Sequence, residues 1–461
     1  MNKNLISKIG IYFLGNLSSK IFSTLLVPIY AFYIAASDLG EFDFYQTLMS
    51  ILSPIILLAV WEAILKFILP EKDTYKKKIA INTAIIFTLS ISIFVLITGL
   101  ILLQLLNMNN SINLLVLVMI VLSSCVAVWQ YFARALRYNK VFAISGILSA
   151  AINFILIVLL VVVFDMGLLG LLISYVGGQL ANLLVIEINI RIIKEIEFKY
   201  FSFVKLKEML AFSSPLVLNI VSAWFLSGYS RLILKIKVGS TENGIYTFAN
   251  KFSMIITMLG TVITMALVEE LIEKSNGNKL SKDFSYLIEN IFKMFLIISI
   301  IGFPMIRTFY FFLGNTEYID SLYYVPLLLL GAVVNIMASN VGTAFQALSL
   351  TRYQFLTTLI GGLSTVVVSS LFITQFGILA VVSAQFLGSI VMLVSRLYFI
   401  NRRQPVNLRF TKIILLACIY IFISSISIKL CLVGNILLMI SLITIYVYIN
   451  KKKLLKLFRR S

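Results

Sequence analysis

The sequence of 461 residues contains no histidine and only three cysteines, Cys125, Cys418 and Cys431. The lack of histidine excludes the catalytic triads, metal sites and proton relays that depend on an imidazole. The cysteines lie inside apolar runs without metal-ligand spacing, so they predict neither a disulfide framework nor a zinc site. Carboxylates, lysine, arginine and polar amides are the chemistry that is left, and we expect no metal and no cofactor.

Charge is scarce as well, at 12% of the chain against about 25% in soluble domains, whereas apolar residues make up 60%. The mean hydropathy is +1.02. No segment is polar enough to form a soluble domain. The composition therefore predicts an all-α polytopic membrane protein whose membrane domain covers essentially the whole chain.

The apolar residues are gathered into runs long enough to cross about 30 Å of hydrocarbon as helices, which predicts about 14 transmembrane helices. These runs fall at 8–34, 42–69, 79–104, 112–134, 141–164, 168–190, 209–230, 244–268, 284–313, 322–348, 353–375, 378–400, 411–428 and 432–450. The first run is longer than the apolar part of a signal peptide and has no convincing cleavage site, so we expect a retained span.

The formal net charge of +19 would suggest nucleic-acid binding in a soluble protein. Here most Lys and Arg residues lie in alternate loops, as the positive-inside rule requires, so the charge predicts topology and no nucleic-acid partner. The opposite loops carry Asp38, Glu41, Asp43, Asp165, Glu317 and Asp320. We therefore expect a multi-pass protein of the plasma membrane with its N and C termini in the cytoplasm.

A weak internal repeat is visible when the chain is compared with itself at a shift of about 204–212 residues. The segment at Gly40 and Phe42 aligns with the segment at Gly244 and Tyr246. An even number of spans per repeat predicts parallel repeats with a substrate path between them. The expected domains are two six-helix lobes, at 1–203 and 204–403, and two additional helices with a basic cytoplasmic tail at 404–461.

Charged residues inside spans are functional candidates, because each costs about 2.5–3.5 kcal/mol at the bilayer centre. Lys20 lies near the middle of the first span beside Asn16. It is about 15 Å from either end and cannot snorkel out, so it either faces a cavity or joins a buried ion pair. Glu62 and Lys66 are four residues apart, so they can pair along one helix face, although Lys66 is also close enough to the inner end to snorkel.

Further cations follow or enter the spans of the second half on the outer side, against the positive-inside trend. They are Arg231, Lys235, Lys237, Lys251 and Arg307. Their position suggests an anionic ligand, and the alternative is snorkelling at span ends. At the inner side, Glu289 and Lys293 are expected to form a helix pair.

Two spans carry polar residues in an otherwise apolar sequence. Span 322–348 presents Asn335, Ser339, Thr343 and Gln346 at helical spacing, and span 209–230 carries several serines and Asn219. Such residues either line a hydrophilic vestibule or pack helices against one another. Their presence in both halves favours the vestibule.

Three local patterns give the chain a resemblance to a known family. They are Gly15-Asn16-Leu17-Ser18 with Trp61-Glu62 and Lys66-Phe67; Ser214-Pro215, Trp224 and Arg231 with Gly244-Ile245-Tyr246; and the segment from Phe132 to Tyr138. The chain resembles the Wzx-type O-antigen and capsule repeat-unit flippases. These form part of the polysaccharide transport branch of the multidrug/oligosaccharidyl-lipid/polysaccharide (MOP) exporter superfamily. An arginine is more usual in that family where Lys66 stands.

The resemblance implies a flippase, not an enzyme, in the bacterial inner membrane. It implies a lipid-linked oligosaccharide on undecaprenyl diphosphate as substrate, moved to the outer leaflet by alternating access through a cationic central cavity. It also implies the lipid bilayer, a glycan polymerase and other assembly proteins as partners, and it leaves coupling to H⁺ or Na⁺ open. The candidate substrate-binding cations are Lys20, Lys66, Arg231, Lys235, Lys251 and Arg307, and the polar or acidic cavity residues are Glu62, Asn16, Asn219, Asn335 and Gln346.

Three alternatives stay open at the level of the sequence. A lipid II flippase for peptidoglycan would differ only in details of the pocket. A cation-coupled multidrug exporter needs embedded acids, of which Glu62 is the main example here. A membrane glycan polymerase or ligase, which belongs to a different class, needs long external loops that this chain does not have. No phosphate-binding loop is present, so the sequence gives no sign of ATP use.

Overall fold

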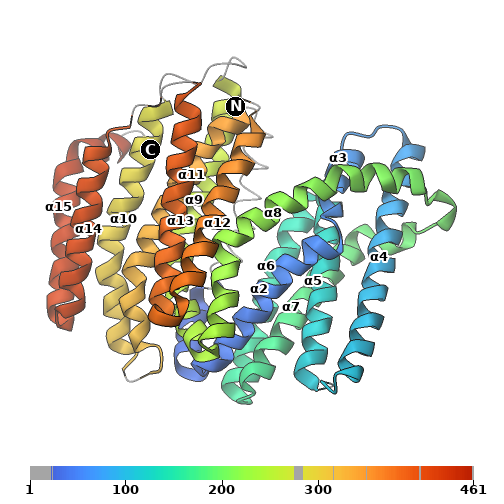
Figure 1. Cartoon of the computed structure of the whole chain (residues 1–461), viewed down its shortest axis with the longest axis horizontal. Coiled ribbons are helices and arrows are strands. Elements are labelled where there is room, and N and C mark those ends of the chain that lie inside the picture. The colour runs from blue at the N-terminus through green and yellow to red at the C-terminus, as the bar shows by residue number, and fades with distance from the viewer. Residues whose placement is uncertain are drawn as a thin grey trace. The chain divides into compact units, whose positions relative to one another are not determined.

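The computed structural model describes residues 22, 24–108, 110–274, 284–314, 316–348, 350–403, 406 and 408–458, and almost all of them are helical (Figure 1). These residues contain no β-strand. Ten of the described helices are long and apolar enough to cross a membrane, and eleven when the bent pair α2 and α3 counts as one span. The prediction of an all-α polytopic membrane protein is therefore confirmed.

The chain forms two compact units, Met1–Gly244 and Ile245–Ser461. Each of the predicted apolar runs overlaps a helix in one of these units. The lobe boundaries expected from the sequence, at 203 and 403, stay a prediction.

The first unit begins, within the described residues, with a short apolar helix at Thr24–Tyr33. Its other elements are α2 (Ala36–Ile56), α3 (Val60–Ile68), α4 (Thr74–Leu105), α5 (Ser111–Ala135), α6 (Asn139–Ile157), the π-helical η1 (Val158–Val163), α7 (Gly167–Ile190), the 3₁₀ turns η2 (Ile192–Glu195) and η3 (Phe198–Tyr200), α8 (Phe203–Lys237) and the start of α9 (Ser240–Lys274).

Helices α2 and α3 form one broken span, bent by 53°. Pro54 lacks an N–H and weakens the last turn of α2. Leu58 and Ala59 then take left-handed backbone conformations, with φ of 46° and 49°. The Ala59 N–H donates to the Pro54 carbonyl at 3.0 Å, which closes a wide turn in place of regular α-helix. The break redirects the chain so that α3 starts along a new axis.

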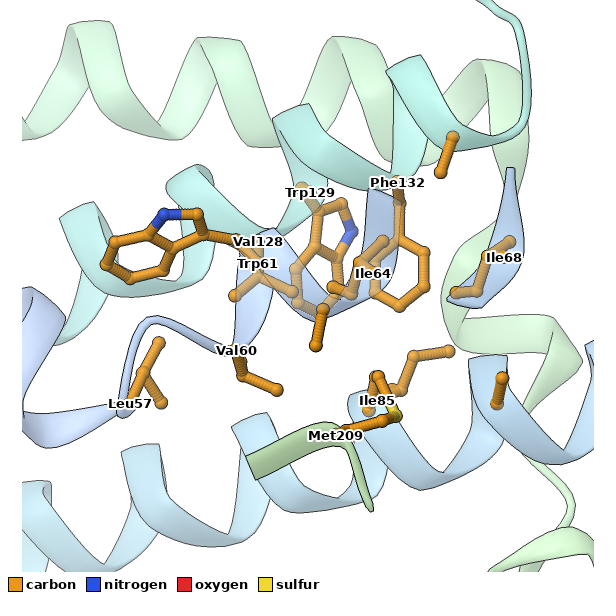
Figure 2. Close-up of a cluster of buried hydrophobic side chains, with 14 of the residues drawn as sticks. Leu57, Val60, Trp61, Ile64, Ile68, Ile85, Val128, Trp129, Phe132 and Met209 are labelled. Carbon is orange, nitrogen blue, oxygen red and sulfur yellow. The ribbon is translucent and has the colours of Figure 1, made fainter. Parts of the chain in front are cut away.

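Helix α3 is held by its apolar face, which packs against α4, α5 and α8. Figure 2 shows Ile64 and Ile68 of α3 close to Trp129 and Phe132 of α5, and Met209 of α8 belongs to the same buried cluster. Full burial of each large side chain contributes about 1.5–3 kcal/mol. This packing fixes the position of the two charged residues of α3, Glu62 and Lys66.

The second unit continues α9 and contains α10 (Phe284–Phe312), η4 (Ile319–Tyr324), α11 (Val325–Ala347), α12 (Thr351–Phe376), α13 (Ile378–Asn401), α14 (Phe410–Lys429) and α15 (Leu432–Phe458). Helix α11 is deeply buried, and most of its residues from Leu328 to Phe345 are inaccessible to solvent. Helices α12 and α13 approach closely because Gly361 lacks a side chain, and a Cβ there would lie 2.9 Å from the Gly388 carbonyl oxygen. Helices α14 and α15 both pack against α10.

The second span begins earlier than the sequence suggested. Asp38, Glu41 and Asp43, expected in an outer loop, all lie in α2, which starts at Ala36. Asp38 stands in the first turn, where a negative charge is favoured by the helix dipole. Its Oδ2 also accepts a hydrogen bond from the Leu168 N–H at 3.0 Å, so it caps the start of α7. Tertiary contacts thus stabilise a helix at the start of α2, where the polar residues of the sequence predicted a loop.

The turn between α14 and α15 depends on Asn435, whose side-chain amide donates to the Ser427 carbonyl at 2.9 Å and the Leu430 carbonyl at 3.2 Å. Its Oδ1 accepts a hydrogen bond from the Ser427 hydroxyl. We expect Asn435→Leu to lower the free energy of unfolding by about 1–3 kcal/mol, because it leaves buried polar groups without partners. Thermal unfolding of the purified protein in detergent measures this loss.

The matched control is Ser425→Ala, which removes an exposed hydroxyl bonded only to the Ile421 carbonyl of its own helix. We expect this variant to unfold like the wild type. Equal stability of Asn435→Leu and Ser425→Ala would contradict the role of Asn435.

Candidate functional site

Two of the predicted cations form ion pairs inside the first unit. The Arg231 Nη1 of α8 lies 3.1 Å from the Asp43 Oδ1 of α2. The Lys235 Nζ lies 3.1 Å from the Glu41 Oε1, which also accepts a hydrogen bond from the Ser240 hydroxyl at 2.6 Å. The acids that were expected to mark an outer loop therefore neutralise cations that were expected to bind a ligand.

Helix α2 also approaches the start of α9 without side chains between them. A Cβ on Gly40 would lie 1.8 Å from the Ser240 carbonyl oxygen, and a Cβ on Gly244 would lie 1.8 Å from the Ala36 carbonyl oxygen. Asn243 adds a hydrogen bond from its amide to the Gly40 carbonyl at 2.8 Å. The predicted internal repeat aligns Gly40 with Gly244, and each of these glycines lies against the backbone of the other's helix.

Glu62 and Lys66 do not pair with each other, although their spacing allowed it. The Lys66 ammonium lies 3.7 Å from the centroid of the Phe212 ring, which is a cation–π contact. The Glu62 Oε1 instead accepts a hydrogen bond from the Tyr131 hydroxyl at 2.7 Å. The Arg134 guanidinium lies over the Tyr131 ring at 5.0 Å. The pairing that the spacing allowed is therefore not formed, and each charge contacts an aromatic residue of another helix instead, Phe212 of α8 or Tyr131 of α5.

The candidate residues of the second unit lie on three helices. Lys251 is half-buried on α9, and the Arg307 guanidinium of α10 lies 4.1 Å from the centroid of the Phe311 ring. On α11, Asn335 is half-buried and Gln346 is exposed. The predicted pair of Glu289 and Lys293 is confirmed by an ion pair within α10.

Three further candidates complete the set. Asn219 is exposed on α8, whereas the neighbouring Ser213 and Ser222 are buried, so the polar residues of this helix do not share one face. Lys20 and Asn16 lie outside the described residues.

Sequence reasoning missed Arg396, which is 4% exposed on α13. Its Nη1 donates to the Ala338 carbonyl of α11 at 2.6 Å, and its Nη2 and Nε donate to the hydroxyls of Thr358 and Thr357 of α12 at 2.9 and 3.2 Å. Within the described part of the chain, no carboxylate pairs with it. The feature of the sequence that could have revealed it is a single arginine inside an apolar run.

A groove of about 410 Å³ lies between α10 and α15. Its walls are apolar at Met294, Ile297, Ile298 and Ile301 and polar at Asn290, Lys293 and Tyr446. Such a combination of an apolar channel and a polar end suits an amphipathic ligand. Among the described residues, no three His, Cys, Asp or Glu side chains are placed to hold a metal ion.

The helices of membrane length define a polytopic membrane protein, and solved structures of a flippase and of multidrug transporters have a similar fold. The lipid II flippase MurJ in its inward closed conformation matches with a TM-score of 0.71 and 15% identity, over 96% of this chain and 100% of that chain. An inward-facing multidrug resistance MATE family transporter of the MOP superfamily matches with a TM-score of 0.65 and 16% identity, over 87% and 94%. An outward-facing form gives 0.60 and 16%, over 89% and 96%. At these identities the likeness concerns the fold.

The sequence itself identifies the family. Residues 5–268, more than half of the chain, match the model of a family described as polysaccharide biosynthesis protein. The chain therefore belongs to the polysaccharide biosynthesis protein family. No curated protein sequence gives a significant match.

Proposed function

We propose that the protein is a flippase that moves an undecaprenyl-diphosphate-linked oligosaccharide from the cytoplasmic to the outer leaflet of the bacterial inner membrane. The observation that carries this proposal is the family match, which places the chain in polysaccharide biosynthesis. The fold supports it, because one protein with a similar fold is a flippase of another lipid-linked substrate. The substrate in this proposal is an O-antigen or capsule repeat unit, and transport proceeds by alternating access.

The diphosphate of such a substrate needs cations whose charge is not already neutralised. Lys66 and Arg307 meet this condition, because each lies on an aromatic ring and neither pairs with a carboxylate of the described chain. Arg231 and Lys235 already share two carboxylates of α2. The proposal therefore ranks Lys66 and Arg307 before Arg231 and Lys235 as ligands of the diphosphate.

The lipid part of the substrate needs an apolar path that is open to the membrane. The groove between α10 and α15 offers isoleucine and methionine side chains along its wall and Lys293 and Asn290 at its polar end. A prenyl chain fits this pattern, since its tail is apolar and its head is charged. The glycan would be held by amides and hydroxyls such as those of Asn335 and Gln346.

The proposed transport needs a driving force that is not ATP, because no phosphate-binding loop occurs in the sequence. The driving force in this proposal is an ion gradient or the supply of substrate. Glu62 is the acid that an H⁺-coupled cycle would use, since its carboxylate pairs with no cation of the described chain and accepts a hydrogen bond from the Tyr131 hydroxyl. Lipid II is the second candidate substrate, and the likeness to MurJ favours it.

We expect Lys66→Gln and Arg307→Gln each to reduce surface glycan about tenfold, if each cation contributes about 1.4 kcal/mol to substrate binding. The measurement is surface glycan in a bacterial strain that lacks its own repeat-unit flippase and expresses the variant. Lys429→Gln is the matched control, because Lys429 is an exposed cation at the end of α14 and is not a candidate ligand.

Immunoblots of the membrane fraction confirm equal amounts of each variant. Normal glycan display by both Lys66→Gln and Arg307→Gln would contradict the proposed binding role. Rescue of a strain depleted of its lipid II flippase, without rescue of glycan display, would assign the protein to lipid II instead.

A further inference from the structure

The segment between α7 and α8 is held rigidly against the start of α4. The Glu197 N–H donates to the Asn82 Oδ1 at 2.6 Å, and the Ser202 N–H donates to the Thr83 hydroxyl at 3.2 Å. The rings of Tyr75 and Tyr200 meet edge to face at 5.8 Å. These contacts hold the 3₁₀ turn η3 in a fixed position. All the residues that form them belong to the first unit, Met1–Gly244.

The acids of this region are occupied by local partners. Asp73 caps α4 by accepting hydrogen bonds from the backbone of Tyr75 and Lys76. Glu71 accepts from two backbone N–H groups, those of Lys72 and Asp73. These carboxylates are used to hold the start of α4 and are not directed at the neighbouring ammonium groups.

Two further acids of this region, Glu197 and Glu208, form ion pairs with lysines. Glu197 lies 2.5 Å from the Lys199 ammonium, whose hydrogen bond holds the pKa of that carboxyl below its usual value, and 3.8 Å from Lys78. Glu208 pairs with Lys205 at 3.0 Å. Of the acids in this region, only Glu195 forms no ion pair and no side-chain hydrogen bond with the described residues.

Six cations are left without a carboxylate partner among the described residues. They are Lys72, Lys76, Lys77, Arg191, Lys194 and Lys207. All are exposed except Lys77, which is half-buried. We call these six residues, together with Phe198 and Phe203, the η3 surface. No carboxylate of the described residues neutralises its cations, so they attract an anionic partner.

The two aromatic side chains of the η3 surface are largely exposed. The side chain of Phe198 is 78% exposed and that of Phe203 is 73% exposed. Topology alone requires positive charge in a loop, but it requires neither a fixed backbone nor exposed phenylalanine beside the charge. Apolar rings next to cations are typical of a surface that inserts at the level of lipid headgroups.

We propose that the η3 surface binds anionic phospholipid headgroups of the membrane leaflet that it faces. The cations contact the phosphates while Phe198 and Phe203 enter the boundary of the acyl chains. A cluster of four to eight cations at the cytoplasmic end of a membrane helix is sufficient for such binding. This inference concerns the surrounding lipid and does not rest on the proposed transport substrate.

The test is the binding of phosphatidylglycerol to the delipidated full-length protein, followed by native mass spectrometry, with phosphatidylcholine as the neutral comparison. Lys76→Gln/Lys194→Gln/Lys207→Gln should weaken phosphatidylglycerol binding by about a hundredfold, since each cation near a membrane surface is worth about fivefold. The triple variant should leave phosphatidylcholine binding unchanged. None of the three exposed side chains forms a hydrogen bond, an ion pair or a ring contact with the described residues, so folding is expected to be preserved.

The control removes the same number of exposed charges from the second unit, as Arg352→Gln/Arg403→Gln/Lys412→Gln. It should bind phosphatidylglycerol like the wild type. Equal losses in both triple variants would show that net charge alone attracts the lipid, and no loss in either would show that the η3 surface is not a lipid site. Either result would overturn the proposal.

A second variant, Phe198→Ser/Phe203→Ser, tests the aromatic part of the surface. We expect it to retain less of both phospholipids, because the insertion of an apolar ring does not depend on headgroup charge. Unchanged retention of both lipids would overturn the role of the two rings. Thermal unfolding of each variant confirms that the fold is intact.

Discussion

Replacing Thr357 and Thr358 together by valine should destabilise the protein more than replacing Arg396 by methionine. The two threonine hydroxyls accept hydrogen bonds from a guanidinium that is 4% exposed and pairs with no carboxylate of the described chain. Without them the buried charge keeps only the Ala338 carbonyl. A buried charge left without its partners costs about 3–5 kcal/mol.

The methionine variant removes the charge together with its need for acceptors. The Thr357 and Thr358 hydroxyls still donate to the Tyr353 and Gln354 carbonyls of their own helix, both at 2.8 Å. Methionine fills much of the same volume, and such swaps usually cost less than about 1.5 kcal/mol. Denaturant unfolding of the purified variants in detergent gives both free energies.

The control for the double valine change is Thr98→Val/Thr308→Val. These half-buried hydroxyls donate to the Phe94 and Pro304 carbonyls of their own helices. We expect this control to unfold like the wild type. A larger loss for Arg396→Met than for Thr357→Val/Thr358→Val would show that the arginine stabilises the fold by itself.

The outcome also decides why an arginine is kept inside a membrane unit. If Arg396→Met folds with wild-type stability and glycan export fails, the charge serves transport. If export continues, the arginine only ties α13 to α11 and α12. Gly342 adds an independent probe, because a Cβ there would lie 2.6 Å from the Arg396 Nη1, so Gly342→Ala should displace the guanidinium without removing it.

The fold was predictable because long apolar runs separated by basic loops leave few alternatives to a polytopic helical protein. Helix boundaries were less predictable wherever a distant segment decides them. The α2 helix includes Asp38 because the Leu168 N–H lies beside its carboxylate. The break at Leu58 and Ala59 was not foreseen either, since both residues are ordinary apolar residues with no preference for left-handed backbone.

The partners of charged side chains were the least predictable part of the candidate site. Spacing placed Glu62 and Lys66 on one face, but it contained no information about Tyr131 of α5 or Phe212 of α8. Likewise, the sequence position of Arg231 predicted that it contacts an anionic group. One such group is the Asp43 carboxylate of the same chain. Hydropathy finds a charge inside a membrane segment, whereas its partner depends on how helices far apart in the sequence pack.

Arg231→Gln should be the more damaging of the two single changes to the ion pair between α2 and α8. The side chain of Asp43 is 5% exposed and that of Arg231 is 23% exposed. Loss of the guanidinium therefore strands a buried carboxylate, whose Oδ2 has no hydrogen-bond partner in the described chain, at a cost of about 3–5 kcal/mol. Asp43→Asn should cost less, because the longer arginine can reach water.

The double variant Asp43→Asn/Arg231→Gln should recover most of that stability, and a cycle of the four proteins gives a coupling energy of about 1–3 kcal/mol. The neighbouring pair of Lys235 and Glu41 is the comparison. Its side chains are 26% and 25% exposed, so its coupling should stay below about 1 kcal/mol. Equal coupling in both pairs would contradict the argument from burial.

Glycan export by the double variant then separates two roles of Arg231. A variant that is stable but fails to export would show that the arginine also contacts the substrate, as its position in the sequence suggested. Normal export would restrict Arg231 to holding α8 against α2. In that case the diphosphate depends on cations that the described residues leave without a carboxylate, such as Lys66 and Arg307, each of which lies on an aromatic ring.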